Sequence, residues 1–216
     1  MPNTSLNEGL QPEIESRKST ETLKVNRSRL ANDQKRGRKH ITATELATIC
    51  KAIKDGSRHP IRDELMTRMC FTHALRVSEL AALQWQHVNL KNRQLRVSRL
   101  KNGIPTMHPI VSKREIMLLN QLHKAAGKPV SGYLFNTERN TPVSANGFQR
   151  MFGTYSEKAL GVKWNAHALR HGCGTNLVDQ NLHLHTIKDY MGHRNIQNTQ
   201  VYLHESAKRF NDIEWD

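Results

Sequence analysis

The chain has 216 residues, 37% of them hydrophobic, which suffices for one ordinary domain with a core and a short additional segment. Lysine and arginine outnumber aspartate and glutamate by 33 to 19, and the formal net charge of +14 favours a polyanionic partner such as nucleic acid. No stretch combines a basic face with a long apolar stripe, and no apolar run could span a bilayer, so we expect no membrane partner.

Three scattered cysteines, Cys50, Cys70 and Cys173, form no Cys-x-x-Cys motif, so the sequence supports neither a disulfide framework nor a zinc finger. Each lies among apolar residues, where a small buried thiol is expected. The first residues lack the apolar segment of a signal peptide. We therefore expect a protein of the reducing cytoplasm.

The first forty residues are polar and lack a clear hydrophobic period, which predicts a basic, disordered tail over residues 1–40. A single acid, Asp33, accompanies the seven basic residues Lys24, Arg27, Arg29, Lys35, Arg36, Arg38 and Lys39. Two interpretations stay open, a solvated tail or a segment that follows DNA phosphates. In the second interpretation Arg36, Arg38 and Lys39 are DNA-binding candidates.

One folded domain is expected over residues 41–216. Thr42 and Glu45 have the spacing of a capping box, and apolar residues follow at helical spacing. A second helix is predicted over residues 61–73, and a short third one ends near Leu83.

The hydrophobic period then changes to two, which indicates strands. Asn102-Gly103 between two extended runs is a strong hairpin signal, so Lys101 is expected at the tip of a two-stranded hairpin whose return strand covers residues 104–110. Ser112 and Glu115 form a second capping box, and further helices are predicted from about residues 144, 166, 184 and 198. The predicted fold class is α+β, mostly helical with a small antiparallel sheet.

The second half of the chain contains the residue types that hold a phosphodiester. In-line attack on such an ester builds negative charge on the non-bridging oxygens, so fixed cations provide most of the catalysis. Arginine binds phosphate through two parallel hydrogen bonds and keeps its charge, which makes Arg76 and Arg170 the candidate clamps. The alternative for Arg76 is a surface ion pair with Glu79, three residues along.

The other candidates move protons or attack. Lys101 is a candidate general acid for the leaving 5′-oxygen, while His167 and His193 add imidazoles that can hold or release a proton at neutral pH. Tyr202 is the candidate nucleophile; the alternative is a core tyrosine with its hydroxyl hydrogen-bonded. His167 and His171 lack the intervening glutamate of a metalloprotease motif, so no metal site is expected.

In this order, the residues resemble the catalytic set of the tyrosine recombinases, over about residues 41–204. The set comprises Arg76 with Glu79, Lys101, His167-x-x-Arg170, Gly192-His193 and Tyr202. Four stretches are also similar to the short fimbrial phase-variation invertases: residues 69–79, 99–103, 106–109 and 189–196. In this comparison Arg99 joins the DNA-binding candidates.

The resemblance implies a tyrosine-recombinase catalytic domain and a site-specific DNA recombinase, with DNA inversion as the expected reaction. Tyr202 would form a 3′-phosphotyrosine and release a 5′-hydroxyl without metal, nucleotide or other cofactor, and Glu79 would orient the pocket. The implied partners are double-stranded DNA with inverted-repeat sites and a homotetramer with one dimer per site, with accessory DNA-bending proteins. The implied location is the nucleoid.

One departure from most recombinases is that only 40 residues precede Ile41, where a DNA-clamping domain of about 100 residues usually lies. The fimbrial invertases share this shortness. Three alternatives stay open: a DNA-binding regulator that keeps the fold without catalysis, an integrase or transposon-borne recombinase, and a topoisomerase of the same chemistry.

Overall fold

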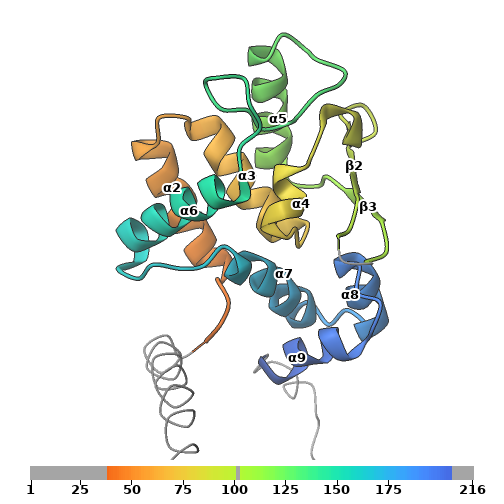
Figure 1. Cartoon of the computed structure of the whole chain (residues 1–216). Coiled ribbons are helices and arrows are strands. Elements are labelled where there is room, and N and C mark those ends of the chain that lie inside the picture. The colour runs from red at the N-terminus through yellow and green to blue at the C-terminus, as the bar shows by residue number, and fades with distance from the viewer. Residues whose placement is uncertain (1–37, 101–102, 206–216) are drawn as a thin grey trace, which may run out of the picture. The chain divides into compact units, whose positions relative to one another are not determined.

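A computed structural model describes residues 38–100 and 103–205, except the side chains of the last two (Figure 1). The chain divides into two units, Met1–Lys39 and His40–Asp216, and every element described below belongs to the second. The tail expected over residues 1–40 lies almost wholly outside the described residues.

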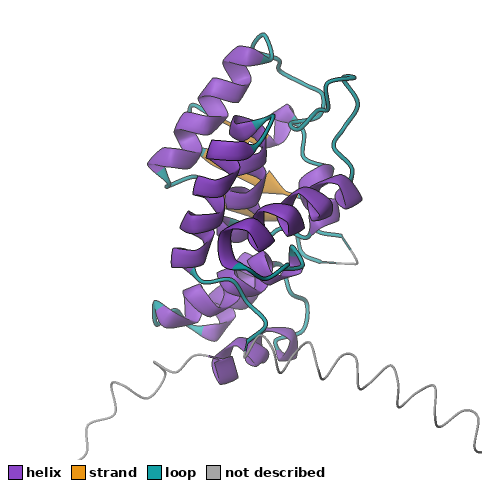
Figure 2. Ribbon diagram, turned by 90° about the vertical axis from the view of Figure 1, so that its left-hand side faces the viewer, coloured by secondary structure: helices purple, strands orange, loops and turns teal. Residues whose placement is uncertain are grey.

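The second unit is mostly helical, with one small sheet among the helices (Figure 2). Its helices are α2 (Ala43–Gly56), α3 (Pro60–Thr72), α4 (Val77–Ala81), α5 (Lys113–Ala125), α6 (Ala145–Leu160), α7 (His167–Asp179), α8 (Leu184–Met191) and α9 (Gln197–Glu205). A short 3-10 helix, η1 (Trp85–His87), follows α4. The α+β class predicted from the sequence is confirmed.

The two predicted capping boxes have different outcomes. At α2 the box is complete, because Thr42 Oγ1 accepts from the Glu45 N–H at 3.3 Å and the Glu45 carboxylate accepts from the Thr42 N–H at 2.9 Å. At α5, Ser112 Oγ accepts from the Glu115 N–H at 3.3 Å. The Glu115 carboxylate, however, pairs with His73 instead of returning to Ser112. The second box is therefore only half formed.

The sheet has three antiparallel strands in the order β1 (Val88–Asn89), β2 (Gln94–Val97) and β3 (Thr106–Pro109). The last pair of the β2–β3 ladder joins Val97 to Thr106, so eight residues connect the strands. The predicted hairpin is therefore present, but its connection is longer than a two-residue turn and its return strand covers 106–109 instead of 104–110. Past the Val97–Thr106 pair, the Ile104 N–H donates to the Gly192 carbonyl at 3.4 Å and the Leu100 N–H donates to the Glu79 carboxylate at 3.1 Å, so neither extends the ladder.

Two hydrophobic clusters organise the unit. The larger one lies among α2, α3, α5, α6 and the sheet and contains Phe135, Phe148 and Phe152. The smaller one joins α7, α8 and α9 and contains Ile187, Met191 and Tyr202. Figure 1 shows α7 running between the two groups of helices, in contact with α3 on one side and α8 and α9 on the other.

All three cysteines are buried and free, as expected from their apolar contexts. Within the described residues, no helix has both the length and the apolarity needed to cross a membrane.

Candidate functional site

Arg76 and Glu79 form the first part of the site, at the start of α4. Glu79 accepts from the Arg76 backbone N–H at 2.9 Å and from Arg76 Nη1 at 2.6 Å. The Glu79 side chain is 1% exposed and that of Arg76 is 26% exposed. The pair is therefore not the surface ion pair considered as the alternative: the carboxylate is buried and holds a guanidinium that still faces solvent.

Arg99 corrects a prediction. Its side chain is 0% exposed, so it cannot contact DNA directly in this structure. Arg99 Nη1 donates to Glu79 Oε2 and to the Ala74 carbonyl, both at 3.1 Å, and Nη2 donates to the Tyr190 carbonyl at 2.8 Å. Arg99 thus ties α8 to the turn before α4 from inside the protein.

Arg170, in the first turn of α7, contacts the same segment before α4 as Arg99 does. It is 2% exposed, and its Nη1 donates to the Ala74 carbonyl that also accepts from Arg99. Burial, and next the charges of Arg76 and Arg99, lower the pKa of Arg170 to about 10, while Glu79 opposes that shift. Arg170 therefore stays charged at neutral pH.

His193 completes a hydrogen-bonded chain from Arg170 to α9. Arg170 Nη2 lies 2.8 Å from His193 Nε2, and His193 Nδ1 lies 2.9 Å from Thr199 Oγ1. Because a guanidinium only donates, Nε2 is the acceptor and the ring hydrogen is on Nδ1, directed at Thr199. Burial, followed by the charge of Arg170, lowers the pKa of His193 to about 4, so the ring is neutral at pH 7.

Gly192 sets the position of His193 for steric reasons. It ends α8 with φ of 65°, in the left-handed region that favours glycine. A Cβ on Gly192 would lie 2.6 Å from Arg99 Cγ and 2.9 Å from the Ile104 carbonyl oxygen. Any larger residue would therefore push Arg99 out of its buried place.

Tyr202 lies on α9 and is 3% exposed. Its ring lies against Gly174 of α7, where a Cβ would come within 2.7 Å of three ring carbons. It also meets the His171 ring at a centroid distance of 5.6 Å. Negative charge on Tyr202 would raise the pKa of Arg170, so its oxygen lies within electrostatic range of that guanidinium.

His167 occupies a different position from the arginines. It is exposed at the start of α7, and its ring meets the His171 ring edge-to-face at 4.7 Å. The rings of His167, His171 and Tyr202 therefore follow one another from the start of α7 to α9. Within the described residues, no group of three or more histidine, cysteine or acidic side chains could hold a metal ion.

Other predicted site residues are only partly placed. Lys101 and Arg36 lie outside the described residues. Arg38 and Lys39 are exposed and belong to the first unit, whereas the site lies in the second. The structure thus brings together Arg76, Glu79, Arg170, His193 and Tyr202.

The charges at the centre of this site favour an anion. Arg76, Arg99 and Arg170 contribute three positive charges and Glu79 one negative charge, which leaves +2 among these four side chains. Arg76 is the most exposed of the three arginines and is the natural first contact for a phosphate.

A buried group that the sequence analysis missed adjoins Arg99. It consists of His73 on the loop after α3, His108 on β3 and Glu115 on α5. The only signal in the sequence was that His73 and His108 occur in stretches that resemble the invertases. Their contact depends on residues 35 positions apart, which periodicity does not reveal.

The sequence model of the phage integrase family matches residues 39–209 of the chain. The type 1 fimbriae regulatory protein FimB of Escherichia coli K12 is 34% identical over 182 residues, which are 83% of this chain and 90% of FimB. The type 1 fimbriae regulatory protein FimE of the same strain is 30% identical over 80% of this chain and 89% of FimE.

Among solved structures, the XerH site-specific recombinase in a post-cleavage complex with its palindromic difH substrate superposes with a TM-score of 0.67. The two sequences are 18% identical, and the superposition covers 81% of this chain and 52% of XerH. This similarity concerns the fold, and it confirms the catalytic-domain architecture inferred from the sequence.

Proposed function

The chain belongs to the phage integrase family, and from this membership we propose that it is a DNA invertase, a site-specific tyrosine recombinase that inverts a DNA segment through a 3′-phosphotyrosine intermediate. The observation that carries the proposal is the convergence of Arg76 and Arg170 on the buried carboxylate of Glu79, with Tyr202 within electrostatic range of Arg170. The fimbrial relatives are matched over nearly their full length, which favours inversion over integration.

In this mechanism Arg76 and Arg170 bind the non-bridging oxygens of the scissile phosphate. Glu79 fixes Arg76 through two hydrogen bonds, and the Ala74 and Met191 carbonyls fix Arg170. Because these contacts exist before DNA binds, the clamps need little reorganisation as charge develops in the transition state. The buried surroundings strengthen their interaction with the phosphate.

The bond changes balance without an external cofactor. The Tyr202 oxygen forms a bond to phosphorus while the bond to the 5′-oxygen breaks. The phenolic proton leaves through the imidazoles beside Tyr202, with His167 as the base, and Lys101 protonates the 5′-oxygen. The phosphotyrosine ester keeps the bond energy, so a 5′-hydroxyl of the partner strand can reverse the step without metal or nucleotide.

In this mechanism His193 first holds Arg170 in place. In the structure its Nε2 accepts from Arg170 and fixes the guanidinium. To donate to the phosphate, as the resemblance implies, Nε2 must carry a hydrogen and must release Arg170 first. DNA binding is therefore expected to exchange the Arg170–His193 contact for contacts from both residues to the phosphate.

The proposed partner is duplex DNA with inverted-repeat sites, bound by four copies of the chain, two on each site, with DNA-bending proteins as accessories. The excess of basic residues supports a polyanionic partner, and the proposed location is the nucleoid. Arg36, Arg38 and Lys39 are proposed to contact phosphates. If both Arg38 and Lys39 do so, changing both to alanine should reduce the slope of log affinity against log salt by roughly 2.

A nicked suicide substrate built from the inverted repeats beside the coding gene tests the nucleophile. The wild-type protein should form a covalent protein–DNA band, and Tyr202→Phe should bind the same DNA without forming it. An adduct in the Tyr202→Phe variant would assign the attack to another residue. DNA retention without any wild-type adduct would support the non-catalytic regulator instead.

The clamps have their own test in the same assay. Arg76→Ala and Arg170→Ala should each slow adduct formation on the order of 100-fold or more at saturating protein, because each removes a donor to the developing charge. Arg139→Ala, an exposed arginine in the loop before α6, is the matched control and should cleave like wild type. Wild-type rates in both clamp variants would refute the mechanism.

A further inference from the structure

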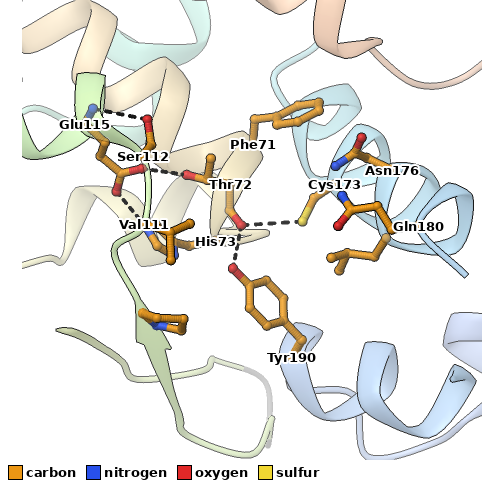
Figure 3. Close-up of a pocket in the computed structure, with 12 residues that line it drawn as sticks. Phe71, Thr72, His73, Val111, Ser112, Glu115, Cys173, Asn176, Gln180 and Tyr190 are labelled. Carbon is orange, nitrogen blue, oxygen red and sulfur yellow. Dashed lines mark hydrogen bonds and ion pairs between the residues drawn. The ribbon is translucent and has the colours of Figure 1, made fainter. Parts of the chain in front are cut away.

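A chain of four buried side chains leads from a pocket of about 200 Å³ to the arginine cluster. In order they are Glu115, His73, His108 and Arg99, and we call them the relay. Figure 3 shows the pocket end, where Glu115 and His73 point toward each other beside Thr72. Each member is at most 7% exposed, so the relay is shielded from water.

The contacts along the relay are all within hydrogen-bond reach. Arg99 Nη2 lies 3.2 Å from His108 Nε2, and His108 Nδ1 lies 3.3 Å from His73 Nδ1. His73 Nε2 lies 2.6 Å from Glu115 Oε1. Every ring nitrogen of the two histidines therefore faces a partner.

Arg99 fixes the direction of these hydrogen bonds. A guanidinium only donates, so the contact with Arg99 requires His108 Nε2 to accept, with the ring hydrogen on Nδ1, and the Thr106 hydroxyl, 2.8 Å away, then donates to the same nitrogen. The Nδ1 hydrogen points at His73 Nδ1, which must then accept, so the His73 hydrogen lies on Nε2 and is donated to Glu115. This arrangement gives each of the four side chains a hydrogen-bond partner.

We propose that His73 and His108 are positioning residues of the recombination reaction, acting through Arg99 on the two arginines that bind the scissile phosphate. The expected effect of these residues on recombination rests on the proposed function. The direction of the hydrogen bonds along the relay does not depend on that function.

Arg99 transmits the position of His108 to both clamps. One end of its guanidinium contacts both histidine residues, since Nη2 lies 3.2 Å from the His73 carbonyl oxygen and 3.2 Å from His108 Nε2. The other end donates to Glu79 and to the Ala74 carbonyl. Glu79 in turn holds Arg76, and Ala74 is shared with Arg170. A shift of Arg99 therefore displaces both clamps together.

His108 is held in the required protonation state by its surroundings. Burial lowers the pKa of His108 to about 3, and the neighbouring His73 and Arg99 lower it further. The Tyr190 ring packs against the His108 ring with a centroid distance of 4.0 Å, and the Tyr190 hydroxyl donates to the Thr72 carbonyl at 2.8 Å. A hydrogen on His108 Nε2 would face the Arg99 donors and break the relay.

Nitrogen–proton correlation spectra of protein with nitrogen-15-labelled histidines test the direction without DNA. We expect His108 protonated only on Nδ1 and His73 only on Nε2 at pH 7, with signals assigned from His108→Gln and His73→Gln. A hydrogen on His108 Nε2, or on both nitrogens of His73, would overturn the relay.

Two variants of His108 test the catalytic part. His108→Leu removes the acceptor for Arg99 and should slow single-turnover adduct formation roughly 10–100-fold, the cost of a small misplacement of reacting groups. His108→Gln keeps a carbonyl acceptor and should recover most of that loss. His123→Leu is the matched control, because it makes the same change at a half-buried histidine of α5 whose Nε2 contacts the Pro129 carbonyl oxygen. It should cleave DNA at the wild-type rate.

A measurement of DNA affinity separates positioning from general damage. The affinity of His108→Leu for the same DNA should stay within about twofold of wild type while its cleavage rate falls, because the basic surface is unchanged. Equal loss of affinity and rate in the leucine and glutamine variants, or a wild-type rate in His108→Leu, would overturn the proposal. If wild type forms no adduct but the ring hydrogens lie as expected, the proposed function fails and the relay direction stands.

Discussion

Changing Gly174 to alanine should displace the ring of Tyr202 and slow DNA cleavage roughly 100-fold. The added Cβ would lie 2.7 Å from Cε1, Cε2 and Cζ of that ring, whereas carbon atoms in contact keep about 3.5–4.0 Å. The ring must therefore move by about 1 Å. A misplacement of that size at a reacting group can cost about 100-fold in rate.

The stability of the Gly174→Ala protein should change much less than its activity. Alanine is favoured over glycine inside a helix by roughly 0.5–1 kcal/mol, whereas overpacking a buried site costs about 1–3 kcal/mol. The two effects oppose each other in α7, so the net loss should be about 2 kcal/mol or less. Urea unfolding followed by circular dichroism measures it, and the folded fraction then corrects the rate.

The assay is single-turnover adduct formation on the suicide substrate at saturating protein. Gly153→Ala is the matched control, because it makes the same change in α6, where the Cβ would lie 3.1 Å from Cε of the flexible Lys163 side chain and in ordinary contact, at 3.7 Å, with the Trp164 carbonyl oxygen. The control should cleave like wild type. A wild-type cleavage rate in Gly174→Ala would show that the close packing of Tyr202 on α7 has no part in the reaction.

Acid should destabilise the protein as pH falls from about 6.5 toward 4. Burial lowers the pKa of His108 to about 3 and that of His193 to about 4, so in this range the unfolded chain binds protons that the folded protein does not. The slope should be about 1.4 kcal/mol per pH unit for each histidine, and unchanged urea midpoints over that range would contradict it. Arg99→Leu should lower the free energy of unfolding by about 3–5 kcal/mol, because it leaves buried acceptors unpaired, and should leave the salt slope of DNA binding unchanged. The change Arg96→Leu, at an exposed arginine, should keep the free energy of unfolding within about 0.5 kcal/mol of wild type. Equal unfolding midpoints for these two variants would argue against the buried role. The Cys50 thiol, whose pKa burial raises to about 12, should react with a thiol reagent only after unfolding, and labelling of the native protein would show that it is accessible.

The helices could be predicted because local sequence largely decides them. The capping box at Thr42 and the apolar spacing after it are properties of neighbouring residues, and α2 forms as expected. Ser144 likewise starts α6 by accepting from the Gly147 N–H. The order of the recombinase motifs was also readable, since it is a property of the chain itself.

Long-range contacts decided the features that the sequence left open or misjudged. Glu115 has the spacing of a capping residue, but His73, 42 positions away, pairs with its carboxylate. Asn102-Gly103 favours a tight hairpin turn, but the ladder ends at Val97 and Thr106, and the N–H groups of Leu100 and Ile104 donate to Glu79 and Gly192 instead of across the strands. In each case a buried polar group needed a partner, and that need outweighed a weak local preference.

Neighbouring residues were enough to predict the helices, and the order of the motifs was enough to identify the family and the chemical groups available for phosphate transfer. The burial of Arg99, its link to Arg76 through Glu79, and the packing of Tyr202 against Gly174 of α7 depend on the folded chain. The difference is one of range, because capping and periodicity act within a few residues, whereas the desolvation of a charge depends on everything that packs around it.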